Sequence, residues 1–252
     1  MIFDNIIAFF INSWDRFINF PDSTELCIHK KFEINKHSST LKILLPPRGD
    51  GDQLVPRILM RRLRKKGYSC LAYFFPKHLL LTDAKKTAEV YDFIRNYVRA
   101  DIAKIQEKHH YKRIDIIAPS LGVVSACLIA NDNRDISNLF LIVPGSCLAK
   151  SLWNGIRTQK LRKIYERQNI NQEKLKQLWA RLELENNVKA LGNAKIWIAI
   201  SRSDKVVPYQ YGKEFGEQLK KFYPDTLIRE NRYLGHYLTV AKYYLFSQEL
   251  LK

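Results

Sequence analysis

Three polar residues follow apolar stretches of the chain, and their types could act together in nucleophilic catalysis. Ser120 lies in "IAPSLG", Asp204 lies in "AISRSDKVVP", and His236 lies in "YLGHYL". A serine hydroxyl is a poor nucleophile at neutral pH unless a base accepts its proton and an acid orients that base. Serine, histidine and aspartate are residue types that supply these three roles.

The turn at Ser120 has two interpretations. Pro119 has no N–H to donate and disfavours helical backbone at Ala118, so a strand is predicted to end there. Gly122 leaves room for a helix to pass close to that strand, and "VVSACLIA" continues at helical spacing. A strand, a sharp turn and a helix with serine at the apex form a nucleophile elbow. The alternative is an ordinary serine N-cap, and this stretch alone fits both.

Apolar strands alternate with amphipathic helices along most of the chain. Strands are expected at 25–34, 40–46, 67–75, 113–118, 138–143, 195–201 and 226–230, and helices at 54–66, 84–109, 121–131, 209–222 and 237–251. The first two strands could form a hairpin. This alternation predicts an α/β fold, a three-layer α/β/α sandwich with a mostly parallel sheet.

Ligands of such sheets bind outside the carboxyl ends of the strands, and Ser120, Asp204 and His236 all follow strands at that edge. His78, in the loop after the third strand, is the second choice as a base. Asp225 precedes its strand and is therefore expected at the opposite edge. The chain order of the favoured group is serine, aspartate, histidine.

The "APSLG" turn, the "SDKVVP" loop and the "GH" before the last helix resemble the three catalytic loops of the α/β-hydrolase fold. The resemblance runs from about residue 25 to the end of the chain. It implies that Ser120 is the nucleophile, His236 the general base and then general acid, and Asp204 the residue that orients His236. The implied activity is that of a serine hydrolase cleaving an ester or thioester through an acyl-enzyme intermediate.

The resemblance also implies an oxyanion hole built from backbone N–H groups. One donor would be the N–H of Leu121, directly after the nucleophile. The other would come from the loop "PPRGDGDQ", where Arg48-Gly49 takes the place of the His-Gly common in the fold. This makes the N–H of Asp50 the second donor, with Gly49 or Gly51 as alternatives. An acidic side chain beside an oxyanion is unfavourable unless it points away or pairs with Arg48.

Residues 148–192, between two predicted strands, are rich in helix formers and longer than a crossover requires. An insertion at this point resembles the helical cap of many α/β-hydrolases. Its aromatic residues Trp153, Tyr165 and Trp179 could line an acyl pocket, or could simply belong to the core. Basic residues outnumber acidic ones in this segment, which could favour an anionic substrate, although the whole chain is similarly basic.

The chain carries 42 Lys and Arg against 25 Asp and Glu, a formal net charge of +17. Such a charge raises the possibility of nucleic acid or membrane lipid as a partner. The densest run, "RRLRKK", lies on a predicted amphipathic helix and fits a solvated helix face. Because no nucleic-acid-binding motif accompanies the charge, specific nucleic-acid binding is not expected.

The N-terminal stretch "MIFDNIIAFFINSWD" has no basic n-region and is interrupted by polar residues, so neither a signal peptide nor a membrane span is expected. A helix packed on the body is favoured over a membrane-surface anchor. The four widely spaced cysteines favour a reducing, cytoplasmic compartment.

Together these patterns predict one α/β-hydrolase domain over residues 1–252 that acts on a small acyl substrate without a metal or organic cofactor. Two alternatives remain open at this stage. One is acyl transfer by the same triad, and the other is a catalytically silent protein of this fold that binds a ligand or an anionic partner. Acyl specificity and oligomeric state are not predicted.

Overall fold

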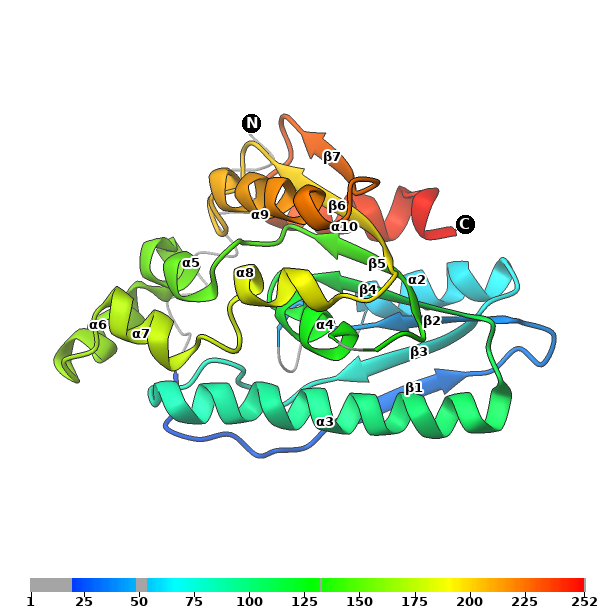
Figure 1. Ribbon diagram of the computed structural model, residues 1–252, viewed down its shortest axis with the longest axis horizontal. Helices are drawn as coiled ribbons and strands as arrows, with labels where there is room; N and C mark the ends of the chain where they lie inside the picture. The colour runs from blue at the N-terminus through cyan, green and yellow to red at the C-terminus, as the bar shows by residue number, and fades with distance from the viewer. Residues whose placement is uncertain (1–19, 49–53, 132, 252) are drawn as a thin grey trace.

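The structure is a computed structural model that describes residues 20–48, 54–131 and 133–251. A seven-stranded sheet runs through the molecule in the order β1-β3-β2-β4-β5-β6-β7 (Figure 1). Every neighbouring pair is parallel except β1 and β3. The strands are β1 (His29–Glu33), β2 (Thr40–Leu44), β3 (Ser69–Phe74), β4 (Arg113–Pro119), β5 (Ile136–Ile142), β6 (Lys195–Ser201) and β7 (Leu227–Asn231).

Helices cover both faces of the sheet, as the sequence pattern predicts for a three-layer α/β/α sandwich (Figure 1). One face is covered by α2 (Leu54–Lys65) and α10 (His236–Phe246), which pack against each other. The other face is covered by α3 (Ala84–His109), α4 (Gly122–Ala130), α8 (Leu184–Asn187) and α9 (Tyr209–Phe222). Each face has its own cluster of buried apolar side chains.

The predicted hairpin between the first two strands is wrong. β1 pairs antiparallel with β3, from His29 opposite Phe74 to Glu33 opposite Cys70, whereas β2 lies between β3 and β4. The reason is burial: β1 consists of mostly exposed polar residues that suit an edge, and β2 and β3 are apolar and buried. The Asn35 side chain donates to the Gly67 carbonyl at 2.8 Å and ties the turn after β1 to the start of β3.

A capping side chain sets the start of α3, and a change of backbone conformation sets the end of α10. α3 begins after Asp83, whose carboxylate accepts the backbone N–H groups of Lys85 and Lys86. The last predicted helix, 237–251, is shorter than expected because the backbone at Ser247 is extended and ends α10; a 3-10 turn, η3 (Glu249–Leu251), follows. The predicted N-terminal helix lies outside the described residues.

A buried ion pair joins the central strands near their amino ends. The Lys42 ammonium lies 2.6 Å from the Asp115 carboxylate, and both side chains are fully buried. Arg113 and Asn138 also donate to Asp115. Burial lowers the pKa of the Lys42 ammonium, although its attraction to Asp115 opposes that shift. This network fixes the alignment of β2, β4 and β5.

The segment between β5 and β6 contains only short helices. They are α5 (Leu148–Asn154), η1 (Ile156–Thr158), α6 (Gln159–Arg167), α7 (Gln172–Leu178), α8 and η2 (Val188–Ala190). In Figure 1, α5, α6 and α7 lie on the side of the molecule toward which the arrows of β3, β4 and β5 point. Within the described ranges, no helix combines the length and the apolar character needed to cross a membrane.

Candidate active site

Ser120 occupies a strained turn between β4 and α4. Its φ angle is +52°, a left-handed conformation that is uncommon for residues other than glycine. The backbone N–H of Ser120 donates to the Ile142 carbonyl of β5 at 2.8 Å, which anchors the turn to the sheet. The turn therefore has the backbone form of a nucleophile elbow rather than that of a serine N-cap, whose backbone is typically extended.

Gly122 allows α4 to begin immediately after this turn. A Cβ atom at this position would lie 2.4 Å from the carbonyl oxygen of Pro46, closer than real Cβ contacts come. Pro46 is buried in the loop that follows β2. The absence of a side chain at Gly122 thus brings this loop against the first turn of α4, next to Ser120.

The side chains of Ser120, His236 and Asp204 form one continuous hydrogen-bonded chain. His236 Nε2 lies 3.0 Å from Ser120 Oγ, and His236 Nδ1 lies 2.7 Å from Asp204 Oδ2. The other oxygen of Asp204 accepts the N–H groups of Val206 and Val207 at 2.8 and 2.9 Å. With Nδ1–H donating to the fixed carboxylate, Nε2 is left to accept the proton of the Ser120 hydroxyl.

Two further serines hold the aspartate and histidine loops together. Ser201, the last residue of β6, donates its hydroxyl to the Leu234 carbonyl and accepts the N–H of Ser203 at 3.2 Å. Ser203 Oγ donates to the Arg232 carbonyl at 2.7 Å. Sequence reasoning did not identify these residues, although the hydroxyls of "SRSD" directly precede Asp204. Their bonds fix the backbone two and four residues before His236.

Leu121 has the position expected of an oxyanion donor. It is the N-cap residue of α4, with helical backbone angles, and its N–H is bonded to no other residue that the structure describes. The first N–H groups of a helix have no partner within the helix and point outward. Asp50, Gly49 and Gly51, the predicted sources of the second donor, lie outside the described residues.

The aromatic residues of the segment between β5 and β6 belong mainly to the core. Tyr165 and Trp179 are fully buried and contact each other edge to face. The Tyr165 hydroxyl donates to the Leu81 carbonyl at 2.6 Å, and Trp179 Nε1 donates to the Ala84 carbonyl at 2.7 Å. They attach this segment to the start of α3, which supports the core alternative over an acyl pocket. Trp153 on α5 is partly buried against the same core.

The alternative base, His78, and the alternative aspartate, Asp225, are not part of the chain of hydrogen bonds from Ser120 to Asp204. His236, not His78, bonds to Ser120. Asp225 is exposed and precedes β7, at the edge of the sheet opposite Ser120. Within the described ranges, no three His, Cys, Asp or Glu side chains are grouped so that they could hold a metal ion.

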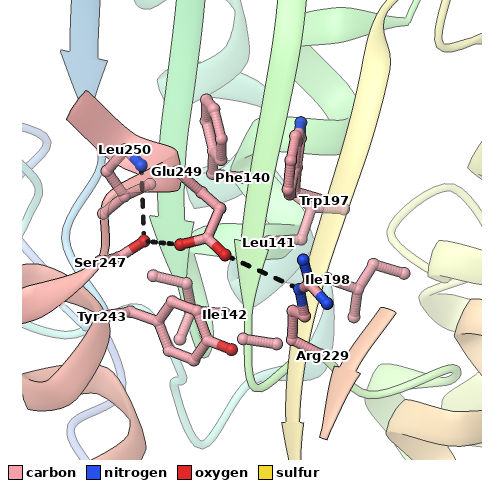
Figure 2. A pocket seen from close by; sticks show the side chains of 11 residues that line it. Phe140, Leu141, Ile142, Trp197, Ile198, Arg229, Tyr243, Ser247, Glu249 and Leu250 are labelled. Atoms are coloured by element: carbon pink, nitrogen blue, oxygen red, sulfur yellow. Dashed lines mark hydrogen bonds and ion pairs between the residues drawn. The ribbon is translucent and has the colours of Figure 1, made fainter. Parts of the chain in front are cut away.

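An open pocket lies away from these residues, on the face of the sheet covered by α10 and η3 (Figure 2). Phe140, Trp197 and Tyr243 line it, and an ion pair between Arg229 and Glu249 crosses its rim. Figure 2 shows none of the three hydrogen-bonded side chains there. A shallow surface depression borders Asp204 instead. The pocket under α10 and η3 contains no comparable group of residues. We therefore place the candidate active site at Ser120, His236 and Asp204.

Comparisons with known proteins agree with this architecture. The esterase Pf2001 of Pyrococcus furiosus matches with a TM-score of 0.60 at 18% identity, over 90% of this chain and 87% of that one. Est1E from Butyrivibrio proteoclasticus, in a structure with bound ferulic acid, matches with a TM-score of 0.61 at 14% identity, over 87% of this chain and 93% of that one. A lipase-esterase related protein from Clostridium acetobutylicum matches with a TM-score of 0.56 at 13% identity, over 89% of this chain and 96% of that one.

The chain has the α/β-hydrolase fold. No protein-family model and no curated protein sequence matches it. Within this α/β-hydrolase fold, Ser120 follows β4, Asp204 follows β6 and His236 follows β7, and all three lie at the carboxyl edge of the sheet.

Proposed function

We propose that this protein is a serine hydrolase that cleaves an ester or thioester bond. The observation that carries the proposal is the continuous chain of hydrogen bonds from Ser120 through His236 to Asp204, at a serine held in a left-handed turn. The fold is shared with proteins described as esterases, which supports the same reaction class.

In the first half of the proposed reaction, Ser120 Oγ attacks the carbonyl carbon of the substrate and His236 Nε2 takes the hydroxyl proton. The carbonyl electron pair moves to its oxygen and forms a tetrahedral oxyanion. When this intermediate collapses, the bond to the leaving alcohol or thiol breaks, and His236 gives its proton to that group. Asp204 stabilises the imidazolium cation while it exists. The product is an acyl ester of Ser120.

In the second half, water attacks the acyl-enzyme while His236 removes one of its protons. The new tetrahedral intermediate collapses, the bond to Ser120 Oγ breaks, and His236 returns the proton to that oxygen. A carboxylic acid leaves and the enzyme is restored. We propose the N–H of Leu121 as one donor to both oxyanions and the N–H of Asp50 as the second, with Gly49 or Gly51 as alternatives.

We also propose that the segment at residues 148–192 acts as a cap. The support is its position: α5, α6 and α7 lie on the side toward which the central strands point (Figure 1), and Tyr165 and Trp179 fix the segment to the body. Because it stands over the carboxyl edge of the sheet, this segment would restrict which acyl groups reach Ser120.

A fluorophosphonate probe tests the proposal directly, since it labels only an activated serine nucleophile. The folded wild type is expected to be labelled, and Ser120→Ala is expected not to be. Ser137→Ala, a control serine on β5, should label like the wild type. Labelling that persists in Ser120→Ala, or that is absent from the folded wild type, would contradict the proposal. A panel of nitrophenyl esters and thioesters with short, medium and long acyl chains then defines the substrate.

A further inference from the structure

The edge of the sheet opposite Ser120 carries a cluster of exposed cations. It is formed by residues 34–39 between β1 and β2, residues 61–68 at the end of α2, and residues 107–113 from the end of α3 to the start of β4. In Figure 1 these segments lie together at one end of the molecule, and α5, α6 and α7 lie at the other. We call six exposed cations of these segments the basic edge: Lys36, Arg61, Lys65, Lys66, Lys108 and Lys112.

Direct contacts join the three segments into one surface. The Asn35 side chain donates to the Gly67 carbonyl at 2.8 Å, which ties the turn after β1 to the end of α2. The Lys112 N–H donates to the Ser39 carbonyl at 2.9 Å, which ties the same turn to the start of β4. A ring contact between His109 and β1, with 5.8 Å between the centroids, holds the end of α3 beside them. The basic edge is therefore contiguous.

The charge of the basic edge is available to a ligand. Two other cations of the run "RRLRKK" are already used, because Arg62 donates to a carbonyl of α10 and Arg64 pairs with Glu33 at 3.1 Å. In contrast, none of the six members pairs with a carboxylate in the part of the chain that the structure describes. Glu107 is the one carboxylate within the three segments. The basic edge thus has a large excess of positive charge.

Helix capping explains part of this cluster. Lys65 and Lys108 lie in the last turns of α2 and α3, where the helix dipole favours cations. Lys36 and Lys112 lie in turns outside the helices, so the dipole does not account for them. The cluster therefore contains more positive charge than the helix ends require, which indicates an anionic partner.

Two exposed imidazole rings lie among these cations. His37 directly follows Lys36, and His110, the C-cap residue of α3, lies two residues before Lys112. From this combination we infer that the basic edge binds a single-stranded nucleic acid. The cations would contact successive phosphates, and the imidazole rings would stack on unpaired bases. Because no nucleic-acid-binding motif accompanies the charge, we expect this binding to be independent of base sequence.

Other polyanions fit the basic edge less well. An anionic membrane is held by apolar side chains as well as by cations, and Ile34 is the one large apolar side chain that the three segments expose. An acidic polypeptide would neutralise the cations but would leave the two imidazole rings without a stacking partner. A nucleic acid strand uses both features.

Fluorescence anisotropy with the full chain and a labelled RNA strand of about 15 nucleotides tests the inference. The logarithm of the binding constant should fall with the logarithm of salt concentration at a slope of about −4, since each of six neutralised phosphates contributes about 0.7. Lys36→Gln/Lys112→Gln should bind more weakly, with a slope of about −3. Lys77→Gln/Lys163→Gln is the matched control, because it removes the same charge from exposed lysines outside the basic edge. It should keep the slope of the wild type.

A second variant, His37→Ser/His110→Asn, tests stacking. Asparagine tolerates the left-handed backbone of residue 110, where φ is +50°, so the fold should be preserved. Because stacking on a single base is worth at least about fivefold in affinity, this variant should bind the RNA strand at least that much more weakly. It should bind an RNA duplex as the wild type does. Unchanged binding of the single strand would show that the inference is wrong.

Competition identifies the occupant of the basic edge. Phosphatidylglycerol vesicles and polyglutamate, each at the same anionic charge as the RNA, should displace the labelled strand poorly. Displacement by either one as effective as that by unlabelled RNA would overturn the inference, in favour of a membrane or an acidic polypeptide. So would the absence of RNA binding at low salt, or equal losses in the Lys36→Gln/Lys112→Gln variant and its control. A DNA strand of the same sequence shows, by the tighter binding of the two, which nucleic acid is preferred.

This inference does not rest on the proposed function, because the basic edge and Ser120 lie at opposite edges of the sheet. Ser120→Ala is expected to bind RNA like the wild type, and Lys36→Gln/Lys112→Gln is expected to be labelled by the fluorophosphonate like the wild type. RNA binding without labelling would leave the basic edge standing and remove the proposed function. Labelling without RNA binding would do the reverse.

Discussion

The carbonyl oxygen of Pro46 lies 2.4 Å from the position that a Cβ atom on Gly122 would take. Only glycine therefore fits between the turn at Ser120 and the loop after β2. This contact joins two parts of the proposed catalytic machinery: the helix that carries the N–H of Leu121 and the loop that is proposed to supply the second oxyanion donor. Because residue 122 is glycine, the start of α4 and the loop after β2 can lie in direct contact.

Gly122→Ala is expected to destabilise the protein by about 1–2 kcal/mol, since the clash outweighs the better helix propensity of alanine. Labelling of Ser120 by the fluorophosphonate should also slow. Thermal unfolding and labelling kinetics measure the two effects. Gly235→Ala is the control, because a Cβ there would lie 3.9 Å from its nearest neighbour, the Ser203 carbonyl oxygen. Equal effects in both variants would contradict the role of the Pro46 contact.

Asp204→Asn is expected to lower kcat by about ten-thousand-fold, the size of the effect in well-studied triads. The amide would retain an oxygen for the N–H groups of Val206 and Val207, so the fold and the melting temperature should change little. What is lost is the acceptor that holds Nδ1–H of His236. Steady-state kinetics on an active ester would show this, with Asp225→Asn expected to match the wild type. A modest effect of Asp204→Asn would rule out its orienting role.

Ser201→Ala is expected to lower kcat by about tenfold with little change in KM, because the Leu234 carbonyl keeps only the longer hydrogen bond from Thr239 at 3.3 Å and the histidine loop can shift. The accompanying loss of stability should be about 1 kcal/mol. Ser201→Thr keeps the hydroxyl and should retain more activity. If both variants lose stability while kcat stays at the wild-type value, Ser201 supports the fold but does not position His236.

Lys42→Met is expected to destabilise the protein by about 1–3 kcal/mol, because Asp115 would lose its buried ammonium partner and keep only Arg113 and Asn138. The double variant Lys42→Met/Asp115→Leu removes both buried charges and should recover most of that loss. Urea unfolding of the two variants and the wild type measures the difference. A double variant less stable than Lys42→Met alone would show that the pair makes a large net contribution.

Alkylation should separate the cysteines. Burial raises the pKa of the thiols of Cys70, Cys127 and Cys147 to about 12. Because the thiolate is the reactive form, on the order of one thiol in ten thousand would be ionised at pH 8. Cys27 is partly exposed. Iodoacetamide is therefore expected to modify Cys27 alone in the native state and all four cysteines in denaturant. Mass spectrometry detects this, and early modification of Cys127 would contradict it.

The sequence was sufficient to predict the fold and to indicate that Ser120, Asp204 and His236 share one edge of the sheet, because each follows a recognisable strand within five residues and parallel strands share a carboxyl edge. It was not sufficient for features that depend on contacts between distant segments. The partner of β1 depends on which strand is more deeply buried, and a pattern of apolar residues on α6 or α7 cannot say whether Tyr165 and Trp179 face a pocket or the start of α3. Likewise, no signal marks the left-handed backbone of Val143, where φ is +50°.

The strand order has a consequence for how the protein is made. Ser120 follows β4 at the centre of the sheet, but its proposed proton acceptor, His236, follows β7, the edge strand that joins last along the chain. Because synthesis proceeds from the N-terminus, a ribosome-bound chain can complete the turn at Ser120 long before β7 pairs with β6. The growing polypeptide would then carry the proposed nucleophile without the proposed base, and its serine would stay unreactive until the final strand has docked.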